Sequence, residues 1–392
     1  MKAFERIKTM TINEKALELH EKWNGKLDTV SKVQVKTRED LALAYTPGVA
    51  EPCKVIAKDP EAAYRYTIKS NTVAVVSDGS AVLGLGNIGP LAAMPVMEGK
   101  AVLFKEFGGI NAFPICLDTQ DTEEIIETVV RIAPAFGGIN LEDISAPRCF
   151  EIEERLKKLL NIPVFHDDQH GTAIVVLAGI INALKVTGKK KEDCRVVVNG
   201  AGSAGVAITK LLLNYGFPHI TMCDKTGMLC KGMEGLNWMQ EKMTQVTNLS
   251  HKTGTLADAM KGADIFVGVS APGIINQDMV RSMAKDSILF TMANPDPEIL
   301  PHLAKEAGAK VVGTGRSDFP NQVNNVIAFP GIFKGALEGH AKQITDKMKL
   351  AAANAIAALV SDEELNENNI MPEAFDPRVA DVVADAVKRN IR

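Results

Sequence analysis

Short apolar runs alternate with glycine-rich or acidic stretches between residues 72 and 165, and helical patterns lie between them, for example at 121–133 and 149–160. This alternation is typical of an α/β fold built on a parallel sheet. The apolar runs of this first series are TVAVVS, AVLFKEF, NAFPICLD, GGINLED and IPVFHDD.

A second series of strands follows a long apolar helix predicted at 172–186, which we interpret as the connector between two domains. These strands end in turn-forming residues, a pattern that predicts a Rossmann-type, doubly wound parallel sheet. They are CRVVVN, HITMCD, ADIFVGVS, SILFTMANPDP and KVVGTGR.

The two ends of the chain are predicted to be helical. Residues 1–40 are polar, with Leu17, Leu19 and Trp23 as spaced apolar contacts, and the chain is helical again after Pro330.

The length of 392 residues is too great for one ordinary core. We therefore expect an N-terminal α/β domain at 1–164, a Rossmann-type domain at 165–340, and C-terminal helices at 341–392 that pack back on the core or on a partner subunit.

Composition excludes several kinds of partner. The formal net charge of −4 provides no basic surface for nucleic acid. The N-terminus lacks the apolar core of a signal peptide, and no uninterrupted apolar run is long enough for a bilayer, so we expect no membrane partner. None of the six cysteines forms a CxxC pair, which favours free thiols in a reducing, cytoplasmic compartment.

A glycine loop at 200–205 has the context of a dinucleotide site. The strand CRVVVN leads directly into it, a helix begins within it, and the next strand ends on Asp224, at the spacing of an acid that binds the ribose 2′-hydroxyl. The residues that would hold the pyrophosphate are Gly200, Ala201, Gly202, Ser203, Ala204 and Gly205.

A second GxGxxG match, at 84–89, lacks this context. The preceding strand ends near Val76, well before the loop, and the following helix would contain Pro90 and Pro95, of which the second would disturb a helix interior. We expect this loop to form an active-site wall or a close packing contact.

Two acidic pairs, Glu142-Asp143 and Asp167-Asp168, each follow a predicted strand. Such pairs are common on solvated surfaces, but at two neighbouring strand ends they can converge, and converging carboxylates repel strongly unless a cation is present. Oxygen ligands alone favour Mg²⁺ or Mn²⁺ over zinc. His166 and His170 could suggest zinc, but their spacing needs a helix, whereas a strand end and a turn are predicted there.

Seven stretches between about residues 38 and 340 together resemble the malic enzymes, specifically the short bacterial-type forms. They are TREDLALAYTPGVAEPC, VVSDGSAVLGLGNIGPLAAMPVMEGKAVLFKEFGGINAFPI, NLEDISAPRCFEIE, FHDDQHGTAIV, VVVNGAGSAG, MANPDPE and RSDFPNQVNNVIAFPGIFKGAL. The resemblance implies oxidative decarboxylation of L-malate to pyruvate and CO₂, with reduction of NAD or NADP and a requirement for Mg²⁺ or Mn²⁺.

The resemblance also assigns roles to individual residues. It implies Tyr45 and Lys100 as catalytic residues, Asp167 as a supporting carboxylate, and Asn294 and Asn325 as substrate contacts, with Asn294 also beside the dinucleotide. The implied metal ligands are Glu142, Asp143 and Asp168.

The chemistry of the reaction fits two of these roles. Lys100 can take the proton of the malate hydroxyl only when neutral, so we expect its pKa to be depressed by burial or by a nearby cation. Tyr45 is the candidate acid that protonates the enol, with Lys100 as its relay.

The chain departs from the long forms of the family at Ala81, where those forms carry an arginine. Ser80, Asn294 and Asn325 are possible replacements as substrate carboxylate ligands. Asp224 would repel a 2′-phosphate and favours NAD, although the adjacent Lys225 could reach that phosphate.

Other functions stay open at this point. The same scaffold could mainly decarboxylate oxaloacetate or convert malate to lactate, and a non-enzymatic dinucleotide-binding protein is a further alternative. A homodimer or larger assembly is expected from the resemblance, and the sequence does not say whether Tyr45 serves its own subunit or a neighbour.

Overall fold

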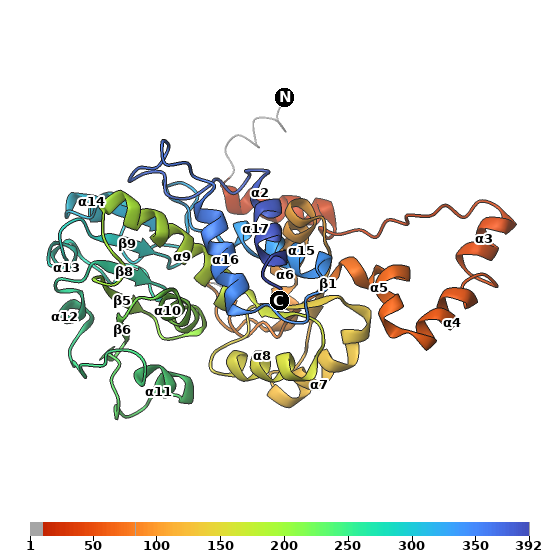
Figure 1. Ribbon diagram of the computed structural model, residues 1–392, viewed down its shortest axis with the longest axis horizontal. Coiled ribbons are helices and arrows are strands. Elements are labelled where there is room, and N and C mark those ends of the chain that lie inside the picture. The colour runs from red at the N-terminus through yellow and green to blue at the C-terminus, as the bar shows by residue number, and fades with distance from the viewer. Residues whose placement is uncertain (1–10, 83, 392) are drawn as a thin grey trace.

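The computed structural model describes residues 11–82 and 84–391, and it contains two sheets with helices on both sides (Figure 1). The first sheet has four parallel strands in the order β2-β1-β3-β4. Every residue of β1 is buried, which explains its continuous apolar run. The strands are β1 (Thr72–Ser77), β2 (Asn111–Cys116), β3 (Gly138–Leu141) and β4 (Val164–His166).

The second sheet has six strands in the order β10-β9-β8-β5-β6-β7, of which only β7 is antiparallel to its neighbour. The strand order reverses between β5 and β8, which is where open α/β sheets bind their ligands. The strands are β5 (Arg195–Asn199), β6 (His219–Asp224), β7 (Gly227–Met228), β8 (Ile265–Gly268), β9 (Ile288–Thr291) and β10 (Val311–Thr314). The predicted fold class is confirmed.

Helices connect the parallel strands of both sheets. In the first sheet they are α6 (Gly89–Gly108), α7 (Thr122–Ile132) and α8 (Arg148–Leu159). In the second they are α10 (Ser203–Tyr215), α11 (Trp238–Thr244), α12 (Leu256–Met260), α13 (Gln277–Arg281) and α14 (Pro301–Glu306).

The helix α9 (Asp167–Thr187) joins the two sheets, and α16 (Asp346–Ala357) packs against it. The helix α17 (Val379–Lys388) packs against α16 and against α15 (Phe329–Glu338). The ring of Phe329 lies 4.7 Å from that of Phe104 on α6, so α15 packs against the first sheet's layer although it follows the second sheet in sequence.

The helix α9 begins five residues before its predicted start. With these residues it is, within 11–82 and 84–391, the one helix long and apolar enough to cross a membrane by length and composition. More than half of its apolar window is buried inside the protein, as for a core helix.

One predicted element is wrong. Residues 101–107, read as a strand-like run, lie inside α6, because their buried positions Ala101 and Phe104 continue the helical spacing set by Met97. Pro95 also lies inside this helix. The missing N–H of Pro95 leaves the Leu91 carbonyl unpaired in the helix, and Leu91 is exposed to solvent.

The helical prediction for residues 1–40 is only partly right. Its first ten residues lie outside the described part of the chain, and the rest contains α2 (Ile12–Trp23) and the start of α3 (Arg38–Ala44) with an extended segment between them. Asn24 and Gly25 both have positive φ and end α2. Its apolar residues are exposed rather than packed: Leu17, Leu19 and Trp23.

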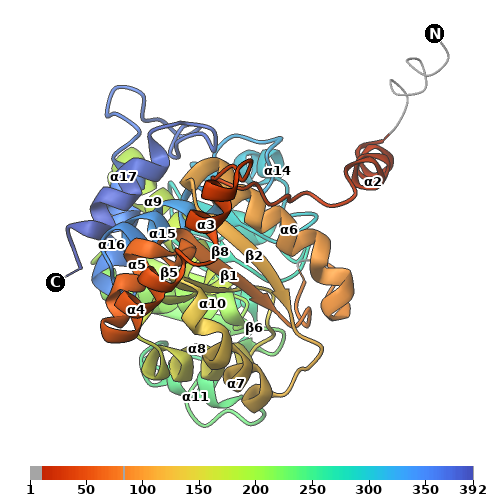
Figure 2. The same ribbon diagram turned by 90° about the vertical axis from the view of Figure 1, so that its right-hand side faces the viewer.

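Residues 24–66 form an arm that leaves the body of the protein. Figure 1 shows α3 and α4 (Ala50–Lys58) at its far end, with α5 (Ala63–Tyr66) leading back to the first sheet, and Figure 2 shows α2 standing apart from the body. None of these four helices has a buried residue. The arm therefore has no apolar core of its own.

Candidate active site

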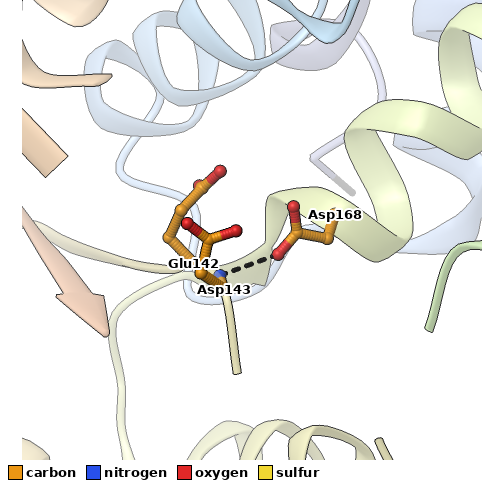
Figure 3. Close-up of side chains that lie close together, drawn as sticks. All are labelled: Glu142, Asp143 and Asp168. Atoms are coloured by element: carbon orange, nitrogen blue, oxygen red, sulfur yellow. Dashed lines mark hydrogen bonds between the residues drawn. The ribbon is translucent and has the colours of Figure 1, made fainter. Parts of the chain in front are cut away.

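The acidic pairs meet because their strands are neighbours. Glu142 and Asp143 follow β3, Asp167 and Asp168 follow β4, and these two strands pair in parallel. One carboxylate oxygen from each of Glu142, Asp143 and Asp168 lies within 4.8 Å of the other two (Figure 3). We call these three residues the acidic cluster.

Asp143, a member of the cluster, has an unusual backbone conformation. Its φ is 54°, in the left-handed region that non-glycine residues rarely adopt. The conformation is fixed by two hydrogen bonds: the N–H of Asp143 donates to Oδ2 of Asp168 at 2.8 Å, and its carbonyl accepts from the N–H of Ala81 at 2.9 Å.

Burial makes the cluster electrostatically costly. Glu142 and Asp143 are 5% and 4% exposed. Burial raises the pKa of each of the three carboxyls, and repulsion between the cluster's carboxylates adds to the rise for Glu142 and Asp143. Oδ2 of Asp143 is buried without a hydrogen-bond partner. Oxygen ligands with an unpaired buried lone pair fit a hard divalent cation.

Lys100 on α6 lies against the cluster and is 7% exposed. Its Nζ is 2.5 Å from Oδ2 of Asp167 and 2.9 Å from Oε1 of Glu142, and it lies 4.1 Å from the centre of the Phe329 ring. Burial lowers the pKa of Lys100, but the carboxylates of Asp167 and Glu142 outweigh it and raise that pKa above its ordinary value. The expectation that burial depresses this pKa is wrong for the protein without a cation.

Asp167 faces Lys100 and has no exposed surface. Besides Lys100, its Oδ2 accepts a hydrogen bond from Nδ2 of Asn325 at 2.6 Å. A Cβ on Gly171 would lie 1.8 Å from Oδ1 of Asp167, so the glycine makes room for this carboxylate. Burial raises the pKa of Asp167 to about 6, with Lys100 opposing the rise.

The glycine loop at 200–205 has the geometry of a pyrophosphate cradle. Gly200 has a φ of 112°, and a Cβ on Gly205 would lie 1.7 Å from the carbonyl oxygen of Gly200, so neither position accepts a side chain. A Cβ on Gly202, which caps α10, would meet nothing within 4 Å, so a ligand can approach the backbone there. Asp224 ends β6 and accepts hydrogen bonds from the backbone and hydroxyl of Thr226.

The loop at 84–89 packs against the loop that follows β9. A Cβ on Gly84 would lie 3.8 Å from the carbonyl oxygen of Asn294 and 3.9 Å from Pro295. Asn294 thus lies between this loop and Gly315, whose own Cβ would be 3.6 Å from the Asn294 amide nitrogen. The loop is a packing wall beside a candidate substrate residue, as the sequence indicated.

The hydroxyl of Ser80 links two loops through hydrogen bonds. Its hydroxyl donates to Asp78 at 2.6 Å and accepts from the N–H of Ser145 at 2.9 Å and from the Arg148 guanidinium at 2.9 Å. Of the three proposed replacements for the missing arginine, Asn294 and Asn325 remain the candidates.

Tyr45 is not part of this assembly of side chains. It caps the C-terminus of α3, at the far end of the arm, and is 67% exposed (Figure 1). The structure therefore brings Lys100, Asp167, Asn325 and the acidic cluster together but leaves Tyr45 outside.

Neither histidine donates a hydrogen bond to the acidic cluster in the described residues, although Nδ1 of His166 lies 3.8 Å from Oδ2 of Asp168. His170 lies in the first turns of α9, because that helix begins at Asp167, and its Nε2 is 2.9 Å from a carboxylate oxygen of Glu153. His166 is fully buried, and neither ring nitrogen has a hydrogen-bond partner within the described residues.

Three residues of the site were not predicted from the sequence. Asn140 donates to Oε2 of Glu142 at 2.8 Å, Arg148 pairs with the buried Asp78 at 2.8 Å, and Glu153 binds His170. The position of Asn140, a polar residue inside an apolar strand, could have indicated a site residue. The charged pattern around Arg148 and Glu153 resembles an ordinary solvated helix, so the sequence did not indicate a role for either residue.

Two family models cover most of the chain. The model of the malic enzyme N-terminal domain matches residues 24–157, and the model of the malic enzyme NAD binding domain matches residues 169–391.

Three individual proteins are similar over 80% or more of their own length. The bifunctional malic/malolactic enzyme of Bacillus subtilis is 59% identical over 97% of this chain and 93% of its own. The NAD-dependent malic enzyme of Geobacillus stearothermophilus is 57% identical over 99% of this chain and 80% of its own. The crystal structure of the NAD-dependent malic enzyme of Thermotoga maritima has a TM-score of 0.92 and 52% identity, and covers 95% of this chain and 98% of its own.

The raised pKa values of the carboxyl groups predict how the stabilisation of the protein by a cation depends on pH. From the ordinary value of 3.8 up to about 6 for Asp168, a member of the cluster, the cation-free folded state binds more protons than the unfolded state, so its free energy of unfolding falls as pH rises. A cation needs the ionised carboxylates, so the increase in Tm caused by excess Mn²⁺ should be larger at about pH 8 than at about pH 5. At 100 times its Kd the stabilisation should reach about 2.7 kcal/mol.

Differential scanning calorimetry of EDTA-treated protein, with and without Mn²⁺, measures this difference. Asp168→Asn is the control and should remove most of the Mn²⁺ effect. Equal increases in Tm at the two pH values would contradict a carboxylate site that titrates in this range.

Proposed function

The chain belongs to the malic enzyme family, and from that premise we propose that it oxidatively decarboxylates L-malate to pyruvate and CO₂ with reduction of NAD⁺. The observation that carries the proposal is the buried Lys100 ammonium, 2.5 Å from Asp167 and 2.9 Å from Glu142, beside the acidic cluster. A lysine buried among carboxylates is suited to move protons where a cation holds the substrate.

Glu142, Asp143 and Asp168 would hold Mg²⁺ or Mn²⁺. Their donor atoms are all oxygens, one of them buried without a partner, which is the ligand set of these ions. Such a cation, when bound, supplies the positive charge that polarises the C2 oxygen of malate during oxidation and decarboxylation.

Lys100 and Asp167 form the proton-transfer pair in this proposal. Lys100 can take the hydroxyl proton of malate only after it has given up one of its own ammonium protons. Asp167 is the base at hydrogen-bond distance that can accept that proton. Burial raises the pKa of Asp167 to about 6, so it holds a proton more readily than an exposed aspartate. Asn325, which donates to the same oxygen, orients Asp167, and it would bind the substrate together with Asn294.

A malolactic conversion is the second candidate. The relative from Bacillus subtilis is described as a bifunctional malic/malolactic enzyme. The same proton-transfer pair would serve either outcome, which differ in whether the dinucleotide leaves reduced or returns its hydride to the product. Lactate, formed without released NADH, would identify this second outcome.

We propose that NAD⁺ is the preferred dinucleotide, bound by the loop at 200–205 with the pyrophosphate over Gly202. Asp224 at the end of β6 supports this choice, because its carboxylate would repel a 2′-phosphate. Lys225, the next residue in the chain, would instead favour NADP⁺. The six free cysteines support a reducing, cytoplasmic location.

We further propose a homodimer, or a larger assembly built from it, in which the arm of one subunit covers the body of another. Fifteen of the 23 large hydrophobic side chains that are exposed in the described residues lie between residues 12 and 68. An apolar surface of this extent is typical of a protein interface. Tyr45 lies in this surface, so it would act as the enol-protonating acid in the site of the neighbouring subunit.

Replacing Lys100 tests the central role in this reaction. Lys100→Met keeps the length of the side chain but removes the amine, and malate-dependent NADH formation with Mn²⁺ should fall by about 10² to 10⁴-fold. Absorbance at 340 nm measures the rate, and chromatography identifies pyruvate or lactate. Lys105→Met, on the exposed face of the same helix, is the control. A near-normal rate for Lys100→Met, or full activity in excess EDTA, would contradict the proposal.

The role of Asp224 is tested by coenzyme preference. Asp224→Ser removes the charge that repels a 2′-phosphate, so the ratio of kcat/KM for NADP⁺ to that for NAD⁺ should rise about tenfold, equivalent to about 1.4 kcal/mol. Asp193→Ser, an exposed position before β5, should leave the ratio unchanged. If Asp224→Ser does not change the ratio, Asp224 does not set the preference.

Subunit complementation tests whether Tyr45 acts across the interface. Tyr45→Phe and Lys100→Met should each be nearly inactive alone. In a randomly mixed dimer population, half of the dimers are hybrids with one intact site of two, so activity should recover to about a quarter of wild type. Rates of the separate and co-refolded variants measure the recovery, and sedimentation measures the assembly. No recovery in a verified mixed dimer would mean that Tyr45 acts within its own subunit.

A further inference from the structure

One carboxylate from α8 holds the first turns of α9, where Asp167 and Asp168 begin the helix. Glu153 is 4% exposed and accepts a hydrogen bond from the backbone N–H of His166 at 3.1 Å. The same carboxylate lies 2.9 Å from Nε2 of His170. Glu153 therefore contacts the chain directly before and shortly after the two aspartates.

The Glu153 carboxylate can only accept hydrogen bonds, so the groups around it must be donors. The backbone N–H of His166 and Nε2 of His170 are two of them. Lys157, one turn along α8, supplies the compensating charge at 2.7 Å from Oε1 of Glu153. The carboxylate thus has three donors, as a buried charge requires.

The contacts of Glu153 lie at the junction between β4 and α9, where the second acidic pair begins. The helix α8 connects β3, which leads to Glu142 and Asp143, with β4, which leads to Asp167 and Asp168. His166 itself offers no side-chain cap to α9, and its ring nitrogens have no partner among the described residues. The Glu153 carboxylate is the side-chain contact that fixes the backbone at this junction.

We propose that Glu153, through His170 and the His166 backbone, is a positioning residue that sets the affinity of the acidic cluster for its divalent cation. The inference rests on the proposed function only in that the cluster binds a cation. Glu153 does not touch the cluster, and it acts by fixing the turn from which Asp168 projects toward Asp143. Groups that orient metal ligands typically contribute 10 to 100-fold in metal affinity.

The experiment measures Mn²⁺ binding directly, by the electron paramagnetic resonance signal of free Mn²⁺, in the full-length protein. Glu153→Gln keeps the shape and one acceptor oxygen but faces Lys157 and His170 with an uncharged amide, and its Kd for Mn²⁺ should rise about 10 to 100-fold. The Kd for NAD⁺, measured by fluorescence, should stay within about twofold, because the glycine loop is held by other contacts. Glu154→Gln, the exposed neighbour on α8, is the matched control and should change neither constant.

A second pair of variants keeps the test valid if Glu153→Gln does not fold. His170→Gln retains an N–H donor near the position of Nε2, and its Mn²⁺ affinity should stay within about threefold of wild type, whereas His170→Leu should weaken it about tenfold or more. An unchanged Mn²⁺ Kd in folded Glu153→Gln, or equal Mn²⁺ affinities for the two His170 variants, would overturn the inference. If wild-type protein binds no Mn²⁺, the proposed cation site itself fails, and the inference fails with it.

Discussion

Repulsion between buried carboxylates is the constraint on which the rest of this structure depends. Glu142, Asp143 and Asp167 are buried at two neighbouring strand ends, and Asp168, whose side chain is 31% exposed, lies beside them. Such a group is unfavourable unless positive charge compensates it. The Lys100 ammonium compensates Asp167 and Glu142, and the remaining oxygens of Asp143 and Asp168 call for a second positive charge. The division of the acids into a lysine-facing member and a cation-binding cluster follows from this balance.

Much of the surrounding structure serves to hold these charges in place. The aromatic ring of Phe329 covers the Lys100 ammonium, and Gly171 leaves the space that the Asp167 carboxylate occupies. Asn140 and Asn325 each donate to one of the acids. These partners come from β3, α9, α15 and the short 3₁₀ helix Asn325–Ile327, so the site exists only after the two sheets have packed together.

The sequence was sufficient where local pattern decides the outcome. The buried strands read as apolar runs, and the convergence of the acidic pairs followed from the rule that parallel strands end at one edge. The run at 101–107 was misread because a short apolar segment fits a buried helix as well as a strand. The pKa of Lys100 and the role of Glu153 could not be inferred, because both depend on side chains that are distant in sequence. The position of Tyr45 depends on the part of the arm around α3 and α4, which buries no residue against the rest of the described chain.

The continuity of α9 has a mechanical consequence. This helix of 21 residues begins with the acids of the first sheet and continues without interruption into the packing of α10, under the second sheet. At about 1.5 Å per residue it is a rod roughly 30 Å long. A rotation of the dinucleotide-binding half relative to the other half would therefore turn Asp167 and Asp168 by the same angle. The C-terminal end of α9 leads to the amino end of β5, where Lys189 pairs with Asp264 directly before β8, so a displacement of that edge of the second sheet reaches the acids through a single rigid element.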